Sequence, residues 1–181
     1  MSFAFAACSS DAELLLPQMG RMRSEVARAL NGLSAEQLRW RPHAGANSIA
    51  FLVWHALRAW DEYHFYMGAG EQLYEPQGWP QRLGFDVGGR GTDGSGMGTG
   101  FTAEDVALVQ PQAGALEEYL DALWGRAQEH LSTASDETLT REVRIPWWSS
   151  PTTQAGVLTH VMFHTLKHLG EAQYARELLP R

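Results

Sequence analysis

Three histidines recur at four-residue spacing near the C-terminal end of the chain, at His160, His164 and His168. A fourth, His55, lies in an earlier apolar segment, SIAFLVWHALRAWDEYHF. Neutral imidazole nitrogens are common ligands of divalent metals such as zinc. Imidazoles directed into an apolar interior need a polar partner, and a metal ion held between facing helices supplies one. The histidines therefore predict a metal site.

The spacing also predicts which of the histidines face one another, because an α-helix turns by about 100° per residue. With His160 at zero, His164 lies near ~40° and His168 near ~80°, inside an apolar arc of roughly ~40° to ~200°. His160 lies at the edge of this arc, which suits the rim of a site. His164 and His168 are the favoured ligand pair. His55 lies at one edge of the apolar face of its own helix, where it can supply the third ligand across a cleft.

Other side chains on these faces could take part in chemistry. Glu62 lies two turns after His55, and Glu171 lies two turns after His164, so each stays on the face of a histidine. Either carboxylate could orient an imidazole, act as a fourth ligand or act as a base, and both are candidate catalytic residues. Trp147 and Trp148 are candidates for lining a substrate or cofactor cleft. A structural role stays open for any one histidine, since buried polar groups are usually hydrogen-bonded.

The elements that must position these residues are predicted to be helices. The periodicity predicts four long ones, over residues ~9–31, ~48–68, ~112–132 and ~153–179. Capping boxes at Ser34 and Thr102 predict two short helices. The segment REVRIPWWSSP is expected to be extended, because Pro146 and Pro151 do not fit inside a helix. With no convincing sheet, the chain is predicted to be all-α, a four-helix bundle forming a single domain over residues 1–181.

A glycine-rich segment, residues 68–100, separates the second and third long helices and holds eleven glycines in 33 residues. Loops of this length in compact domains are usually functional or disordered, so a cover over the site and plain disorder are both open. Gly89 to Gly94 matches the GxGxxG pattern of dinucleotide sites. No apolar strand precedes it and no helix opens after it, so no nucleotide site is expected.

The composition excludes several classes of partner. The 14 Lys and Arg are scattered among 21 acidic residues and the net charge is -7, so no nucleic acid is expected. No apolar run reaches the ~20 residues that span a bilayer, so no membrane is expected. The single cysteine, Cys8, excludes an internal disulfide and indicates a cytoplasmic protein.

The second long helix carries apolar residues outside its main apolar arc. These residues are Phe51, Trp54, Leu57 and Phe65. A second apolar face indicates burial against another subunit or against the glycine-rich loop. A homodimer is therefore expected.

Three segments resemble proteins of the DinB/YfiT superfamily. The first is LSAEQLRWRPHAGANSIAFLVWHALRAWDEY, which contains Trp54-His55 in the second long helix. The others are GMGTGFTAEDVALVQP and HTLKHLGEAQYARELLP, in which Leu169 stands where arginine is frequent. The resemblance covers the chain from about residue 11 onward. It implies up-down-down-up connectivity and a metal held by His55, His164 and His168.

The resemblance also implies a chemistry. Several relatives are thiol-dependent and resemble bacillithiol or mycothiol S-transferases and isomerases. The leading hypothesis is a metalloenzyme that uses zinc or nickel to activate a low-molecular-weight thiol for transfer to a small electrophilic substrate. The superfamily name reflects DNA-damage induction in one lineage, a stress response that implies no DNA chemistry. A hydrolase acting through metal-bound water and a non-catalytic metal-binding or structural bundle remain open.

Overall fold

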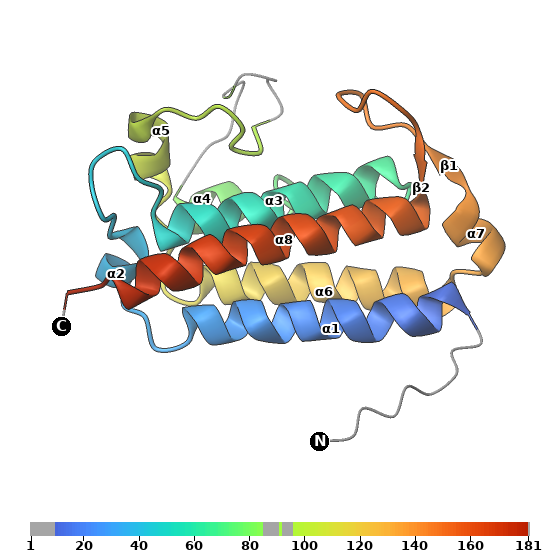
Figure 1. The fold of residues 1–181 in the computed structure, drawn as a ribbon, viewed down its shortest axis with the longest axis horizontal. Coiled ribbons are helices and arrows are strands. Elements are labelled where there is room, and N and C mark those ends of the chain that lie inside the picture. The colour runs from blue at the N-terminus through green and yellow to red at the C-terminus, as the bar shows by residue number, and fades with distance from the viewer. Residues whose placement is uncertain (1–9, 85–90, 92–95, 181) are drawn as a thin grey trace.

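A computed structural model describes residues 10–84, 91 and 96–180 of the chain. Four long helices lie side by side along its long axis (Figure 1). They are α1 (Asp11–Leu30), α3 (Ile49–Tyr66), α6 (Ala115–Thr133) and α8 (Gln154–Glu177). The all-α class and the helical bundle are therefore confirmed.

Hydrogen bonds at the helix ends fix the relative directions of three of these helices. Arg176, in the last turn of α8, donates to the backbone carbonyls of Arg28 and Ala29 near the end of α1. The two C-terminal ends therefore meet, and α1 and α8 run in the same direction. Gln154, at the start of α8, donates to the carbonyl of Met67 just after α3, at 2.8 Å. Consequently α3 runs antiparallel to α8, which lets His55 near the start of α3 face the C-terminal half of α8.

The sequence determines where the helices begin through side-chain caps. Ser48 accepts a hydrogen bond from the backbone N–H of Phe51 at the start of α3, at 3.1 Å. Thr153 accepts one from Gly156 at the start of α8, also at 3.1 Å. The predicted capping boxes at Ser34 and Thr102 are present and begin α2 (Ala35–Arg39) and α5 (Ala103–Leu108). These caps fix the register of the helices that carry the histidines.

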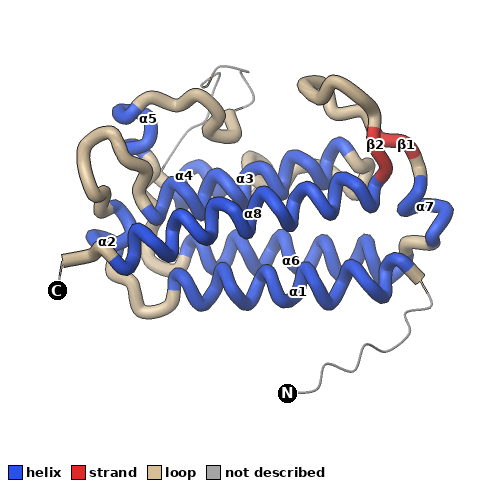
Figure 2. Tube along the Cα trace, viewed as in Figure 1, coloured by secondary structure: helices blue, strands red, loops and turns tan. Residues whose placement is uncertain are grey.

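Short elements depart from the sequence-based expectation. Helices α4 (Trp79–Leu83) and α7 (Asp136–Thr140) were not predicted. The expectation of no sheet is corrected by an antiparallel pair of two-residue strands, β1 (Glu142–Val143) and β2 (Thr152–Thr153), shown in red in Figure 2. The prolines at 146 and 151 lie in the connection between these strands, where they interrupt no ladder hydrogen bond.

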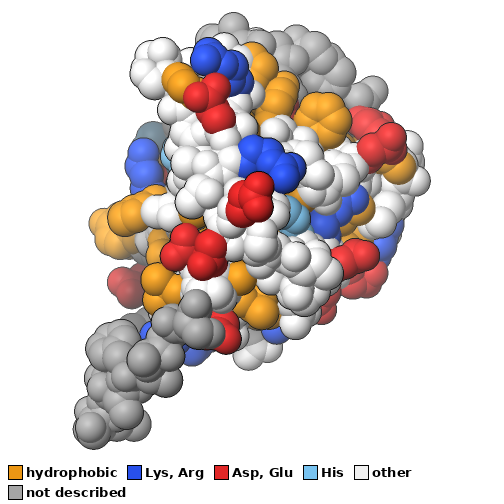
Figure 3. Space-filling view, turned by 90° about the vertical axis from the view of Figure 1, so that its right-hand side faces the viewer, with side chains coloured by type: hydrophobic (Ala, Val, Ile, Leu, Met, Phe, Trp, Pro, Cys, Tyr) orange, Lys and Arg blue, Asp and Glu red, His pale blue; other side chains and the backbone are white. Residues whose placement is uncertain are grey.

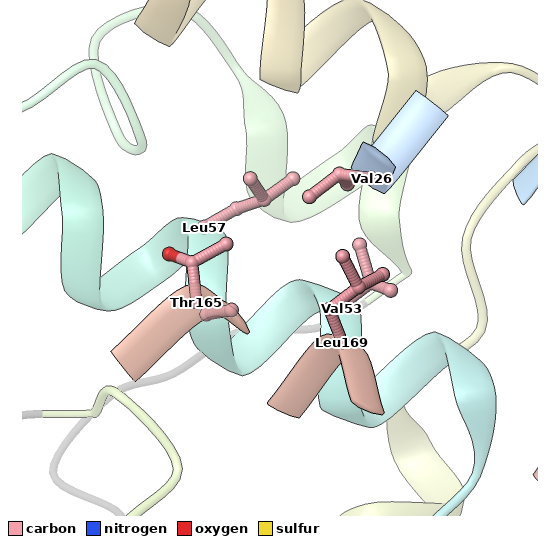
Figure 4. A pocket seen from close by; sticks show the side chains of 6 residues that line it. Val26, Val53, Leu57, Thr165 and Leu169 are labelled. Carbon is pink, nitrogen blue, oxygen red and sulfur yellow. The ribbon is translucent and has the colours of Figure 1, made fainter. Parts of the chain in front are cut away.

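The core between α1, α3 and α8 is apolar and tightly packed. Figure 4 shows Val26 of α1, Val53 and Leu57 of α3, and Thr165 and Leu169 of α8 around a small gap. The gap is too narrow for a water molecule. Thr165 and Leu169 each follow a histidine directly, so His164 and His168 are rotated by about 100° from this core position.

A buried ionic group fastens the segment after α3 to the bundle. The Asp61 carboxylate is fully buried and accepts hydrogen bonds from the backbone N–H groups of Leu73 and Tyr74 and from the Tyr119 hydroxyl, at 2.8 to 3.0 Å. The guanidinium of Arg58 lies 3.5 Å from it and compensates its charge. Residues 67–114, between the end of α3 and the start of α6, are called the long connection below, and these bonds tie its start to α3 and α6.

The apolar surface of α3 is covered within the chain itself. Phe51, Trp54 and Leu57 are at most 5% exposed, and Phe101 lies against the rings of Phe51 and Trp54. Of the two expected ways of burying this face, covering by the glycine-rich segment is observed, because Gly98 and Phe101 lie against Phe51 and Trp54, while Leu57 belongs to the core. Only Phe65, at 45% exposed, leaves the face open, so the homodimer stays a prediction.

Two further expectations concern residues outside the described part of the chain. Cys8 lies there, as does most of the Gly89–Gly94 pattern. Among the helices that are described, none has the length and apolar character needed to cross a bilayer.

Candidate metal centre

Three imidazoles from two helices meet in one place. His55 comes from α3, and His164 and His168 come from successive turns of α8. Their ring centroids lie 4.6 to 4.9 Å apart in all three pairs, and one nitrogen of each lies within 4.8 Å of the others. The antiparallel packing of α3 and α8 thus brings together the three residues that the sequence pattern selected.

His55 is held by the backbone of the long connection. Its Nδ1 lies 2.5 Å from the carbonyl oxygen of Met97, so Nδ1–H is the donor and Nε2 carries the lone pair. Phe51 stacks on the ring with an interplanar angle of 3°. A carbonyl bond to one nitrogen commonly fixes the tautomer of a metal-binding histidine.

Gly98 makes this approach of the backbone possible. Its φ is +114°, a conformation that residues with a side chain rarely adopt. A Cβ at this position would lie 2.8 Å from Nδ1 of His55 and 3.1 Å from the ring of Trp54. The close contact between the connection and the histidine therefore requires glycine at this position.

His168 is oriented by a carboxylate. Its Nδ1 lies 2.8 Å from Oε2 of Glu171, one turn further along α8. Nδ1–H donates to the carboxylate, which leaves Nε2 free to bind a cation. Of the roles open to Glu171, this contact favours orientation of the imidazole.

His164 is the least satisfied of the three histidines. Its Nδ1 is buried and has no hydrogen-bond partner among the described residues. Burial, together with the neighbouring His55 and His168, lowers the pKa of His164 to about 3. The ring is therefore neutral at pH 7 and keeps a lone pair available for a metal.

The donor set fits a divalent cation. Three neutral imidazoles suit zinc, nickel and similar metals. In a tetrahedral site with bonds of about 2.0–2.1 Å, ligand nitrogens lie about 3.4 Å apart. The separations of up to 4.8 Å are wider than this, so small side-chain rotations would be needed to close the site. The buried Nδ1 of His164, which has no partner among the described residues, marks a polar group of this cluster whose hydrogen-bonding capacity is unused.

His160 lies next to this cluster but outside it, as its position on the helix predicts. Its ring is stacked on His164 at 5.9 Å and meets the edges of Tyr63 at 5.1 Å and Trp148 at 4.7 Å. Burial lowers its pKa. Trp148 thus approaches the histidines, whereas Trp147 is 37% exposed and packs on Tyr63 at 6.2 Å.

Glu62 has a different environment from that of Glu171. It is buried, and the guanidinium of Arg58 lies 3.6 Å from its Oε2. Burial raises the pKa of the nearby Tyr66, and the negative charge of Glu62 contributes to this rise. Glu62 does not belong to the group of three histidines, and its proposed proton-transfer role stays a prediction.

Sequence reasoning missed two parts of the site. The Met97 carbonyl and Gly98 lie in a segment without periodicity, 42 residues or more from His55. A glycine at a close backbone approach is a recognisable signal only when the approaching partner is known. The contact of Tyr63 with His160 was not predicted either.

The end of the molecule that carries β1, β2 and α7 is shown in Figure 3. Acidic and basic side chains are interspersed on this face, with hydrophobic side chains exposed among them. Among the described residues on this face, the Lys and Arg side chains do not form a stripe of the kind that binds nucleic acid.

Comparisons with known proteins concern the family and the fold of the chain. Residues 18–172 match the family model of the DinB superfamily. A crystal structure described as a conserved protein from Enterococcus faecalis superposes with a TM-score of 0.79 at 21% sequence identity, covering 94% of this chain and 98% of that chain. At this identity the likeness shows the fold. A search of curated proteins finds no match to the chain.

Proposed function

Since the chain belongs to the DinB superfamily, we propose that it is a divalent-metal-dependent enzyme that activates a low-molecular-weight thiol for transfer to an electrophile. The observation that carries the proposal is the three-histidine cluster, in which two rings are oriented through Nδ1 and the third has a buried nitrogen with no partner among the described residues. The choice of a thiol rests on the resemblance to thiol-dependent members of the superfamily.

A bound zinc or nickel ion would supply positive charge that lowers the pKa of a thiol or a water. The residues of the chain do the rest. His55, His164 and His168 would hold the ion without neutralising its charge, because a neutral imidazole ligand carries no charge of its own. Glu171 holds the ring of His168. Glu62 is proposed to accept or deliver a proton, and Trp147 and Trp148 to line the side where the thiol or substrate binds.

The first experiment is elemental analysis of protein purified without a histidine tag. We expect about one divalent ion per chain, as one three-histidine site holds one ion. The His164→Ala variant should lose this metal and the His160→Ala variant should keep it. Absence of stoichiometric metal from the wild-type protein would contradict the proposal.

The second experiment separates the reaction classes. Metal-loaded protein is given a low-molecular-weight thiol with a model electrophile, and in parallel a panel of esters and amides. Thiol transfer that depends on metal and on His164 supports the proposal. Hydrolysis of the panel without thiol transfer would instead support a hydrolase, and the absence of both activities would favour a non-catalytic bundle.

A further inference from the structure

A continuous group of rings leads from the histidine cluster to the surface. We name it the aromatic wall, and it consists of Tyr63, Tyr66, Trp147, Trp148 and His160. His160 joins it to the metal centre, because its ring is stacked on that of His164 at 5.9 Å. From His160 the ring of Trp148 lies 4.7 Å away. Side chains of α3, of α8 and of the β1–β2 connection thus form one surface.

The outer end of the wall is open. Trp147 is 37% exposed, and its ring meets Tyr66 edge-on at 5.3 Å. Phe65 continues the aromatic surface beyond Tyr66, at 5.3 Å, and is itself 45% exposed. Large aromatic side chains are usually covered in a soluble protein, and an exposed group of them marks a binding surface.

The backbone holds the exposed ring in place. Trp147 and Trp148 lie in the connection that joins β1 to β2, whose strands pair Val143 with Thr152. The backbone N–H of Trp148 donates to the carbonyl of Ile145 at 3.0 Å, and Pro146 restricts the backbone beside it. A ring on a constrained backbone loses little conformational entropy when it binds a ligand.

Packing within the chain accounts for an aromatic side chain at Trp148 but does not require one at Trp147. Trp148 packs against Tyr63 and His160, and so attaches the connection to the bundle. Trp147 lies further out and contacts Tyr63 at 6.2 Å. A recess of about 180 Å³ runs along Trp148, lined also by Arg144, Ser149 and Ser150. This recess adjoins one member of the wall, Trp148.

We infer that the aromatic wall binds a planar, ring-bearing group of the molecule that reacts at the histidine cluster. Flat rings match a surface of rings because stacked and edge-to-face contacts add about 0.5–1.5 kcal/mol per pair beyond the burial of area. The inference rests on the proposed function for the reaction, whereas the binding of the ring is a separate property of the wall.

Ring binding is tested in metal-free protein by calorimetry with naphthylmethanol and its fully saturated analogue. The wild-type protein should bind the aromatic alcohol about threefold to tenfold more tightly than the saturated one. The Trp147→Leu variant, which keeps an apolar side chain, should lose this preference. The matched control is Phe163→Leu, which removes a ring that is 73% exposed on α8 and should keep the preference.

The link to the metal centre is tested with cobalt-substituted protein and the two corresponding thiols. An absorption band appears when the thiol sulfur binds cobalt, and its growth gives the thiol concentration at half-saturation. This concentration should be lower for the aromatic thiol than for the saturated thiol. The Trp147→Leu variant should again abolish the difference. The inference is overturned by any of three results: equal affinity for the two alcohols, no saturable binding of either alcohol, or a preference for the aromatic alcohol that persists in Trp147→Leu. A preference for the alcohols without one for the thiols overturns the assignment of the ring to the reacting molecule.

These outcomes are distinguishable from failure of the proposed function. If metal or thiol transfer is absent but metal-free protein prefers the aromatic alcohol, the wall binds rings and only the chemistry is wrong. If thiol transfer is present without the preference, the chemistry holds and the wall is structural.

Discussion

Glu171 holds the ring of His168 through a hydrogen bond of 2.8 Å between Oε2 and Nδ1. The two residues lie three positions apart on α8, so the helix itself places the carboxylate beside the imidazole. Met97 does the same for His55 from a distant part of the chain, with a carbonyl oxygen in place of a carboxylate. The two bonds direct Nε2 of both rings away from their supports.

The Glu171→Gln variant should bind zinc more weakly. Glutamine keeps the size of the side chain but removes the negative charge that holds and polarises His168, and loss of such a partner typically costs about 10-fold to 100-fold in metal affinity. Competition with a chromogenic chelator measures the change. Glu177→Gln, at the end of the same helix and exposed, is the control and should retain the wild-type affinity. Equal affinities of all three proteins would assign Glu171 no part in the site.

The Gly98→Ala variant should lose both stability and metal affinity. The added Cβ would meet His55 Nδ1 at 2.8 Å, and alanine at φ +114° is strained, which together predict a loss of about 1–3 kcal/mol of unfolding free energy. Displacement of the Met97 carbonyl should weaken zinc binding about tenfold. Urea denaturation and chelator competition provide the two measurements.

Gly125→Ala is the matched control for Gly98→Ala. Gly125 lies within α6, and apart from its own helical backbone no atom of the described residues lies within 4 Å of the position of its Cβ. Alanine there should stabilise the helix by about 0.5–1 kcal/mol and leave metal affinity unchanged. If Gly98→Ala behaves like Gly125→Ala, the connection does not hold His55.

Helical periodicity accounts for the parts of the site that were predictable. The i and i+4 spacing of His164 and His168 fixes their common direction, and the wheel position of His160 places it beside them. The same reasoning put Glu62 on the face of His55. It could not show that Arg58, one turn earlier, lies 3.6 Å from that carboxylate. Helix faces can be read from a sequence, whereas competition between partners for a buried charge depends on packing.

Contacts made by irregular segments were not predictable in the same way. Residues 96–101 have no periodic pattern, yet Met97, Gly98 and Phe101 cover His55, Phe51 and Trp54. The five-residue helices α4 and α7 offer too few turns for periodicity to distinguish them from a loop. The cap at Ser135, whose hydroxyl accepts from the N–H of Thr138 at 3.1 Å, was the available signal for α7.

The Asp61→Asn variant should be strongly destabilised. The carboxylate is fully buried, accepts hydrogen bonds from three donors and balances the positive charge of Arg58. A neutral asparagine would leave part of the buried charge of Arg58 without compensation. The expected loss of unfolding free energy is about 3–5 kcal/mol. The control is Asp121→Asn, which breaks a surface ion pair with Arg23 and should cost at most about 1 kcal/mol. Similar losses in the two variants would show that the buried group does not anchor the connection.

The stability of the protein should fall as the pH is lowered from about 6.5 toward 3, in part because of His64. This residue is fully buried on α3, with Nδ1–H donating to the carbonyl of Trp60 at 3.2 Å. Burial lowers its pKa to about 3, and the nearby His130 and Arg126 add to this effect. Below pH 6.5 the unfolded chain binds a proton that the native ring does not, so His64 removes about 1.4 kcal/mol of unfolding free energy per pH unit. Urea denaturation at several pH values measures the effect. The unfolding free energy of His64→Leu should depend less steeply on pH than that of the wild type, whatever the absolute stability of the variant. Parallel profiles of the two proteins would refute a buried neutral His64.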